Sequence, residues 1–242
     1  MSDTAFNNIT LGPSFFKIQR AIDGKQERRS ADPLNVVIVN AAKLARTYYE
    51  AEYDPTSPSA PTCWSSDTVV PSPDVPLRQR QANRCMSCEQ NIKGSSKGGG
   101  RACRYSQRLA IILEEQMDTI YQLRIPATSI FGKAKDGNMP MQAYAKYLHG
   151  HKTSSISVVT QVSFDANSDI PKLFFKALRP LNGKEQQTAL KQKSSPAASM
   201  AALQTVVVPE KTSIDKSPFE VVDGFKYKEN DNGGSQHNYT FD

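Results

Sequence analysis

The four cysteines of this sequence, Cys63, Cys85, Cys88 and Cys103, are the residues best suited to chemistry. Two cysteines separated by two residues can bind one Zn²⁺ from a tight turn, with each sulfur about 2.3 Å from the ion. Cys85 and Cys88 have this spacing, whereas the other two cysteines stand alone. Four thiolates leave no open coordination position, so the pattern predicts a structural zinc site that does no chemistry itself. Free buried thiols and a redox pair are the alternatives.

The cysteines can meet only if the chain between them folds back. Cys63 lies in residues 54 to 76, a segment rich in proline, serine and threonine that is unsuited to regular structure for most of its length. Cys103 follows a glycine-rich loop at residues 94 to 100, which is flexible enough to return it toward the cysteine pair. Closing the long loop after Cys63 costs little entropy, although nothing in the local sequence forces this residue to join the other three.

Basic residues crowd the segment that holds three of the cysteines. Residues 76 to 108 carry eight Lys and Arg against the single acid Glu89, a local charge of +7 in a chain whose total is +6. Cations that neutralise phosphates and aromatic rings that stack on bases allow sequence-tolerant binding of a single strand, and a solvated basic face is the alternative. The residues predicted to contact nucleic acid are Arg84, Lys93, Lys97, Arg101, Arg104, Arg108, Trp64 and Tyr105.

Catalytic interpretations find little support in the sequence. His149 and His151 flank the glycine that ends a predicted helix, where a positive charge suits the helix dipole better than a metal does. Glu114 and Glu115 could hold Mg²⁺ for a nuclease, but neighbouring strand residues point to opposite faces and a turn explains them more simply. No set of nucleophile, base and orienting group can be assembled, so we expect that the protein is not an enzyme.

Hydrophobic patterning predicts the elements that must position these residues. Strands are expected at residues 34 to 39, 47 to 53, 108 to 113 and 119 to 125, and a β-hairpin near residues 155 to 180. One short helix is expected to start around Asn138 and to stop at Gly150, because Met141, Tyr144 and Leu148 form one apolar face. The prediction is therefore mainly β.

Composition indicates that part of the chain contributes nothing to a core. The apolar fraction is 38% and the mean hydropathy is −0.53. Residues 182 to 205 read as a linker or a frayed helix, and residues 206 to 242, with a net charge of −3, read as a flexible, mildly acidic tail. With neither a secretion signal at the start nor a membrane-spanning run, we expect a cytoplasmic protein that does not enter a membrane.

Several of these features occur together in one family. They are the run Cys63–Asp67, the Cys85–Cys88 knuckle, Leu123–Pro126, Val159–Asp165 and Leu173–Lys176. Over residues 34 to 180 their order resembles tailed-phage single-stranded-DNA-binding proteins that carry a zinc subdomain on an OB-fold. The resemblance implies an OB-like barrel that binds single-stranded DNA, or RNA, in a basic groove with the zinc loop as one wall. It also implies a role in DNA replication or recombination in the cytoplasm of an infected cell.

The fold expected from these features is an OB-like, partly open barrel of five to six strands with one short helix and an insertion in which the four cysteines bind zinc. Residues 1 to 181 would form this nucleic-acid-binding domain, with the insertion at residues 54 to 107. The tail resembles the acidic, aromatic-tipped tails that recruit replication or transcription proteins, although lysines dilute its charge. A zinc-stabilised module that docks on a polymerase or another phage protein, or that regulates transcription, is the alternative function.

Overall fold

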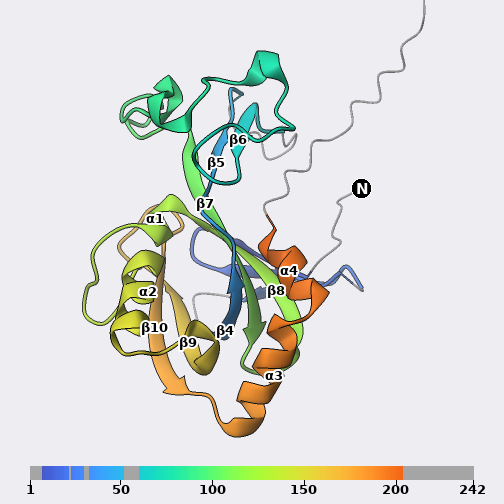
Figure 1. Ribbon diagram of the computed structural model, residues 1–242. Helices are drawn as coiled ribbons and strands as arrows, with labels where there is room; N and C mark the ends of the chain where they lie inside the picture. Colours follow the sequence, from blue (N-terminus) through green and yellow to red (C-terminus); the bar gives the residue numbers. More distant parts are fainter. Residues whose placement is uncertain (1–6, 22, 30–32, 52–59, 204–242) are drawn as a thin grey trace, which may run out of the picture. The chain divides into compact units, whose positions relative to one another are not determined.

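A computed structural model describes residues 7–21, 23–29, 33–51 and 60–203, so the predicted tail at residues 206 to 242 lies outside it. The described residues form one sheet of ten strands (Figure 1). The strands are β1 (Asn8–Leu11), β2 (Phe16–Gln19), β3 (Gln26–Arg29), β4 (Leu34–Ala41), β5 (Ala45–Tyr48), β6 (Cys63–Ser65), β7 (Arg104–Leu113), β8 (Gln116–Pro126), β9 (Val158–Phe164) and β10 (Leu173–Pro180). The sheet is mixed, because β1 and β8 run parallel while the other strand pairs are antiparallel.

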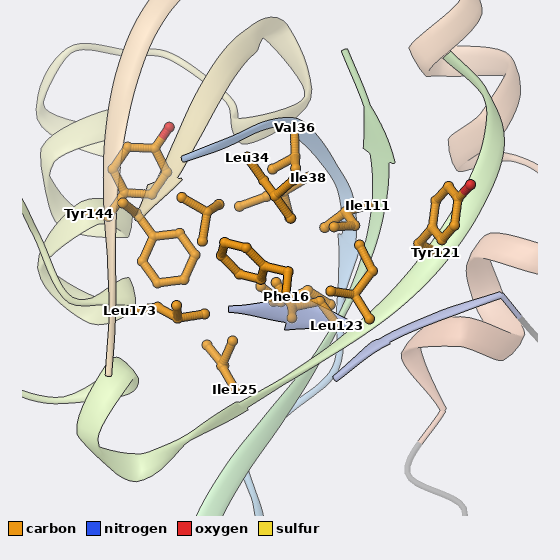
Figure 2. Packing of buried hydrophobic residues seen from close by; sticks show 14 of the residues in the cluster. Phe16, Leu34, Val36, Ile38, Ile111, Tyr121, Leu123, Ile125, Tyr144 and Leu173 are labelled. Atoms are coloured by element: carbon orange, nitrogen blue, oxygen red, sulfur yellow. The ribbon is translucent and has the colours of Figure 1, made fainter. Parts of the chain in front are cut away.

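The sheet curls into a half-barrel. Its hydrogen-bonded order is β10-β9-β4-β7-β8-β1-β2-β3, with β5 and β6 attached beside the first part of β7. Phe16 on β2 and Phe164 on β9 are far apart in this order, yet their ring centroids lie only 4.6 Å apart. A flat sheet could not bring them together, since neighbouring strands are about 4.8 Å apart. In Figure 2, Phe16 lies among side chains of β4 and β10.

The central strands are buried on both faces because both of their alternating residue sets are apolar. On β4, Leu34, Val36 and Ile38 point into the inner cluster, whereas Val37 and Val39 belong to a second cluster on the outer face. The same alternation holds on β7. The half-barrel therefore has an inner and an outer core.

Helices cover both faces (Figure 1). Helices α1 (Ala127–Ile130) and α2 (Met141–Gly150) pack on the inner core, where Tyr144 and Leu148 are buried. Helices α3 (Gly183–Lys193) and α4 (Pro196–Ala202) bury alanines against the outer core.

Two features of the fold differ from the sequence prediction. A linker or frayed helix was expected at residues 182 to 205, but Asn182 and Glu185 form a capping box that starts α3, and both helices pack on the sheet. The predicted count of five or six strands is too low, and the predicted single helix is only one of four in the described residues.

The remaining predictions of secondary structure are confirmed in outline. Strands occupy residues 34 to 39, 108 to 113 and 119 to 125; α2 ends at Gly150, and β9 and β10 form the hairpin. The strand expected at 47 to 53 is shorter and lies at β5. Among the described residues, no helix combines the length and the apolar character needed to cross a membrane.

Candidate metal centre and basic surface

A three-stranded segment positions two of the cysteines. Strand β5 lies between β6 and β7 and pairs antiparallel with both. Cys63 begins β6, where it pairs with Tyr48, and Cys103 immediately precedes β7. The sheet therefore brings together two cysteines that are forty positions apart in the sequence.

Short 3-10 helices carry the other two cysteines: η2 (Cys85–Ser87) and η3 (Glu89–Asn91). The Cys85 amide donates a hydrogen bond to the Val69 carbonyl at 2.9 Å, and the Cys103 amide donates to the Gln90 carbonyl at 2.8 Å. The Asn91 side chain donates to the Cys85 carbonyl at 3.0 Å. These bonds tie the proline-rich segment, the knuckle and the start of β7 to one another, and the term "lobe" below refers to residues 60–106 with β5.

All four cysteines line one small pocket of about 20 Å³, together with Arg46 and other side chains. Each is a free thiol; Cys63, Cys85 and Cys88 are buried and Cys103 is half-buried. Within the described ranges, however, no three His, Cys, Asp or Glu residues converge as a ready metal-ligand set. Lining one pocket shows only that the cysteines are near one another, whereas tetrahedral coordination of Zn²⁺ requires sulfur–sulfur distances of about 3.8 Å. The thiols share a site without forming a closed cluster.

Burial dominates the chemistry of these thiols. It raises the pKa of Cys63, and it raises the pKa of Cys103 to about 12, while the Arg46 guanidinium acts in the opposite direction on Cys103. Without a metal both thiols are therefore protonated at neutral pH. Metal binding would have to displace these protons.

Arg46 is a buried cation in the same pocket, with 2% of its surface exposed. Its guanidinium donates a hydrogen bond to the Tyr105 hydroxyl and lies 4.0 Å from the centroid of that ring. One nitrogen lies 3.9 Å from the Met86 sulfur, but Nε and Nη1 have no hydrogen-bond partner. A buried charge with unpaired nitrogens is costly unless an anion accompanies it. Four thiolates around Zn²⁺ would carry a net charge of −2, which would compensate the charge of Arg46.

The predicted nucleic-acid contacts divide into exposed and buried groups. Five cations of the lobe are exposed: Arg84, Lys93, Lys97, Arg101 and Arg104. Arg101 donates to the Asn91 carbonyl at 2.5 Å, so its guanidinium is held near the knuckle. Arg108 is half-buried on β7, and its guanidinium donates to the Leu203 carbonyl.

The two predicted stacking residues are less accessible than the sequence suggests. Trp64 is only 4% exposed and packs with Cys63 and Val75, so its ring has no free face for a base in this structure. Tyr105 is half-buried between Arg46 and Phe131, with its ring edge-on to that phenylalanine. Trp64 therefore lines the cysteine pocket, and Tyr105 packs on Arg46, which lines the same pocket.

The residues weighed for catalysis have structural partners. Glu114 forms an ion pair with Arg179 at 2.6 Å, and Glu115 forms one with Arg29. His151 lies at the end of α2, where its ring nitrogen contacts the Tyr147 carbonyl at 2.8 Å. These contacts account for the carboxylates and for His151 without a catalytic role.

Sequence reasoning missed Arg46, because a single arginine in a short strand carries no motif. Only its position could have indicated a role, because Arg46 lies on β5, the strand between Cys63 at the start of β6 and Cys103 just before β7. Comparison of the chain with protein-family models, with curated proteins and with solved structures finds no match. The function must therefore be argued from the site itself.

Proposed function

We propose that this protein binds single-stranded DNA with little sequence preference, in replication or recombination of the phage type, and catalyses no reaction. The observation that carries the proposal is the exposure of Arg84, Lys93, Lys97, Arg101 and Arg104 on one lobe. Between positions 76 and 108 only one acid opposes the cations. Phosphate neutralisation by such cations releases counterions and supplies most of the affinity of sequence-tolerant binding.

The proposal includes a structural Zn²⁺ held by Cys63, Cys85, Cys88 and Cys103. When bound, the ion would supply only cross-linking, because four thiolates fill its coordination sphere. The unpaired nitrogens of buried Arg46 support it, since they leave room for a nearby anionic centre. A lobe with few helices or strands of its own needs such a cross-link to hold its cations in one arrangement.

The test is an anisotropy titration of labelled single-stranded and duplex oligonucleotides at several salt concentrations, with zinc measured on the same preparation. We expect about one zinc per chain, a preference for the single strand and an affinity that falls steeply with salt. The double variant Arg101→Gln/Arg104→Gln should lower the slope of log affinity against log salt by about 1.4, at about 0.7 per phosphate contact. The matched control is Lys146→Gln/Lys152→Gln, which removes two exposed cations from α2 and the turn that follows it.

Two results would overturn parts of the proposal. An affinity that does not change with salt would reject phosphate neutralisation as its basis. If the protein contains zinc but binds no nucleic acid, the proposed metal centre stands and the proposed function is rejected. A protein-docking module would then explain the lobe better.

A further inference from the structure

The outer face of the sheet carries cations in register across five neighbouring strands. Arg108 on β7 pairs directly with Arg124 on β8, and Lys17 on β2 pairs directly with Arg28 on β3. Between these pairs lies β1, whose Thr10 is the partner of Lys17. In the parallel pairing of β1 with β8, Ile9 is the partner of Leu123. Extending this register by one residue on each strand places Thr10 beside Arg124.

These cations all lie on the same face. Leu109, Leu123, Ile9 and Ile18 belong to the inner core, so the strand residues adjacent to them in sequence point outward. The residues Lys17, Arg28, Arg108 and Arg124 are called the cation row below. At about 4.8 Å per strand, the row extends about 19 Å from β7 to β3.

Helix α4 ends at the β7 end of the row, beside Arg108. The Gln122 side chain, one step along β8 from the row, donates to the Ala201 carbonyl at 2.8 Å, and Arg108 reaches the carbonyl of Leu203, which caps the helix. Arg28 and Arg124 are exposed, and Lys17 is half-buried. Among the described residues, the row is therefore exposed at Arg28 and Arg124 and half-buried at Lys17 and Arg108.

On β8, β1, β2 and β3, the described strand residues that neighbour the row on this face add no negative charge. The adjacent row on β8, β1, β2 and β3 consists of amides, since Gln122 pairs with Asn8, Asn8 with Gln19, and Gln19 with Gln26. Glu27, the acid on β3, pairs with inward-facing Ile18 and so lies on the opposite side. Like charges directly opposite each other on paired strands destabilise a sheet, so an anion bound along the row would relieve this repulsion.

We propose that the cation row is a second phosphate-binding track, which carries single-stranded nucleic acid across the outer face from β7 to the β2–β3 hairpin. The inference rests on the proposed function and adds a binding surface outside the lobe. At the far end of the track, the Arg28 guanidinium lies 3.9 Å from the centroid of the Phe15 ring. An aromatic ring beside a row of cations is the combination that suits a single strand better than a duplex.

The test compares the triple variant Lys17→Gln/Arg28→Gln/Arg124→Gln with a matched control, Lys133→Gln/Lys176→Gln/Lys191→Gln. The control removes the same charge from exposed lysines outside the row. Arg108 stays unchanged because it also holds the cap of α4. Affinity for a labelled oligothymidine is measured between about 50 and about 200 mM salt, together with the melting temperature of each protein.

We expect the row variant to lose about two units of salt slope, at about 0.7 per phosphate contact, while the control keeps the slope of the wild type. Its melting temperature should not fall, because the substitutions relieve cross-strand repulsion. If the row variant and the control bind alike, the track is wrong and the proposed function stands on the lobe alone. Failure of the wild type itself to bind would overturn the proposed function and the track together. Loss of binding to poly-glutamate, with oligothymidine binding unchanged, would assign the row to an acidic protein and overturn the inference.

Discussion

Arg46 and Tyr105 face each other across β5 and β7, and the guanidinium of Arg46 lies over the tyrosine ring at 4.0 Å from its centroid. Arg46 of this pair lines the cysteine pocket. It holds a buried cation in place while leaving two of its nitrogens unpaired. The proposed metal site and the strand pairing of the lobe therefore share one residue, Arg46.

Replacing Arg46 should weaken the proposed metal site. Arg46→Met keeps much of the side-chain volume but removes the positive charge beside the thiolates. Loss of an outer-shell partner of a metal site typically costs about 10- to 100-fold in affinity, and we expect a loss in this range. Competition for Zn²⁺ with a chromogenic chelator measures it. Arg78→Met, an exposed position on the same lobe, is the control, and equal affinities of the two variants would contradict the role given to Arg46.

Trp64 should report on the metal site and not on the bound strand. It is the sole tryptophan of the chain and is buried next to Cys63. Chelation of the metal should loosen the pocket, expose the indole and shift its emission to longer wavelength. Adding oligothymidine to the metal-loaded protein should leave the emission maximum unchanged, because the ring has no free face. Strong quenching by the oligonucleotide would restore Trp64 as a stacking residue.

Phe16 should be among the most costly residues to truncate. It is fully buried and contacts Phe164, which joins the N-terminal strands to the β9–β10 hairpin. Phe16→Ala should lower the free energy of unfolding by about 3–5 kcal/mol, measured by urea denaturation. Phe15→Ala is the matched control, since that ring is only half-buried, under Arg28. A similar loss in both variants would mean that the half-barrel is not closed by Phe16.

The ion pair between Arg179 and Glu185 should make stability depend on acid pH. The Arg179 guanidinium, with help from the Asn182 amide, lowers the pKa of Glu185 to about 2, below the value of about 4.3 for an unfolded chain. A lowered pKa contributes stability above the unfolded pKa, and this contribution disappears as the pH falls toward about 2. The melting temperatures of the wild type and Glu185→Gln should therefore differ near pH 6 and converge near pH 2.

Arg179→Gln supplies the reciprocal measurement. It removes the partner of Glu185 and of Glu114, so its melting temperature should converge with that of the wild type over the same pH range. High salt should shrink both differences at pH 6, because these side chains are partly exposed and screened. A difference that persists at pH 2 would show that the substitutions act by another route.

The sequence predicted best the strands with a clear apolar pattern. Most of β4 and the second half of β7, Leu109 to Leu113, are continuously apolar, and on β9 the period of two places Val158 and Val162 on the core. The N-terminal strands escaped prediction because each has only four residues and β3 is Gln-Glu-Arg-Arg. Their pairing is decided by contacts with β8 and β9, which no local pattern reveals.

Helices α3 and α4 on the outer face were not clearly predicted, because their buried residues are small. Ala189, Ala198 and Ala201 form the buried stripe of α3 and α4, but alanine among lysine, glutamine and serine has the composition of a linker. This stripe can be recognised as a packing face only from the sheet surface that the two helices cover. Similarly, cysteine spacing predicted a shared pocket, whereas the position of Arg46 and the burial of Trp64 depend on strand register.

Strand β7 changes partners along its length. Residues 104 to 106 pair with β5, whereas from Ser106 onward the strand pairs with β8 and then also with β4. Ser106 is therefore the position at which β7 passes from the lobe into the half-barrel. If the lobe opened, the hydrogen bonds before Ser106 would break while those after it stayed protected. Amide exchange along a single strand would then record the state of the lobe and of the half-barrel separately.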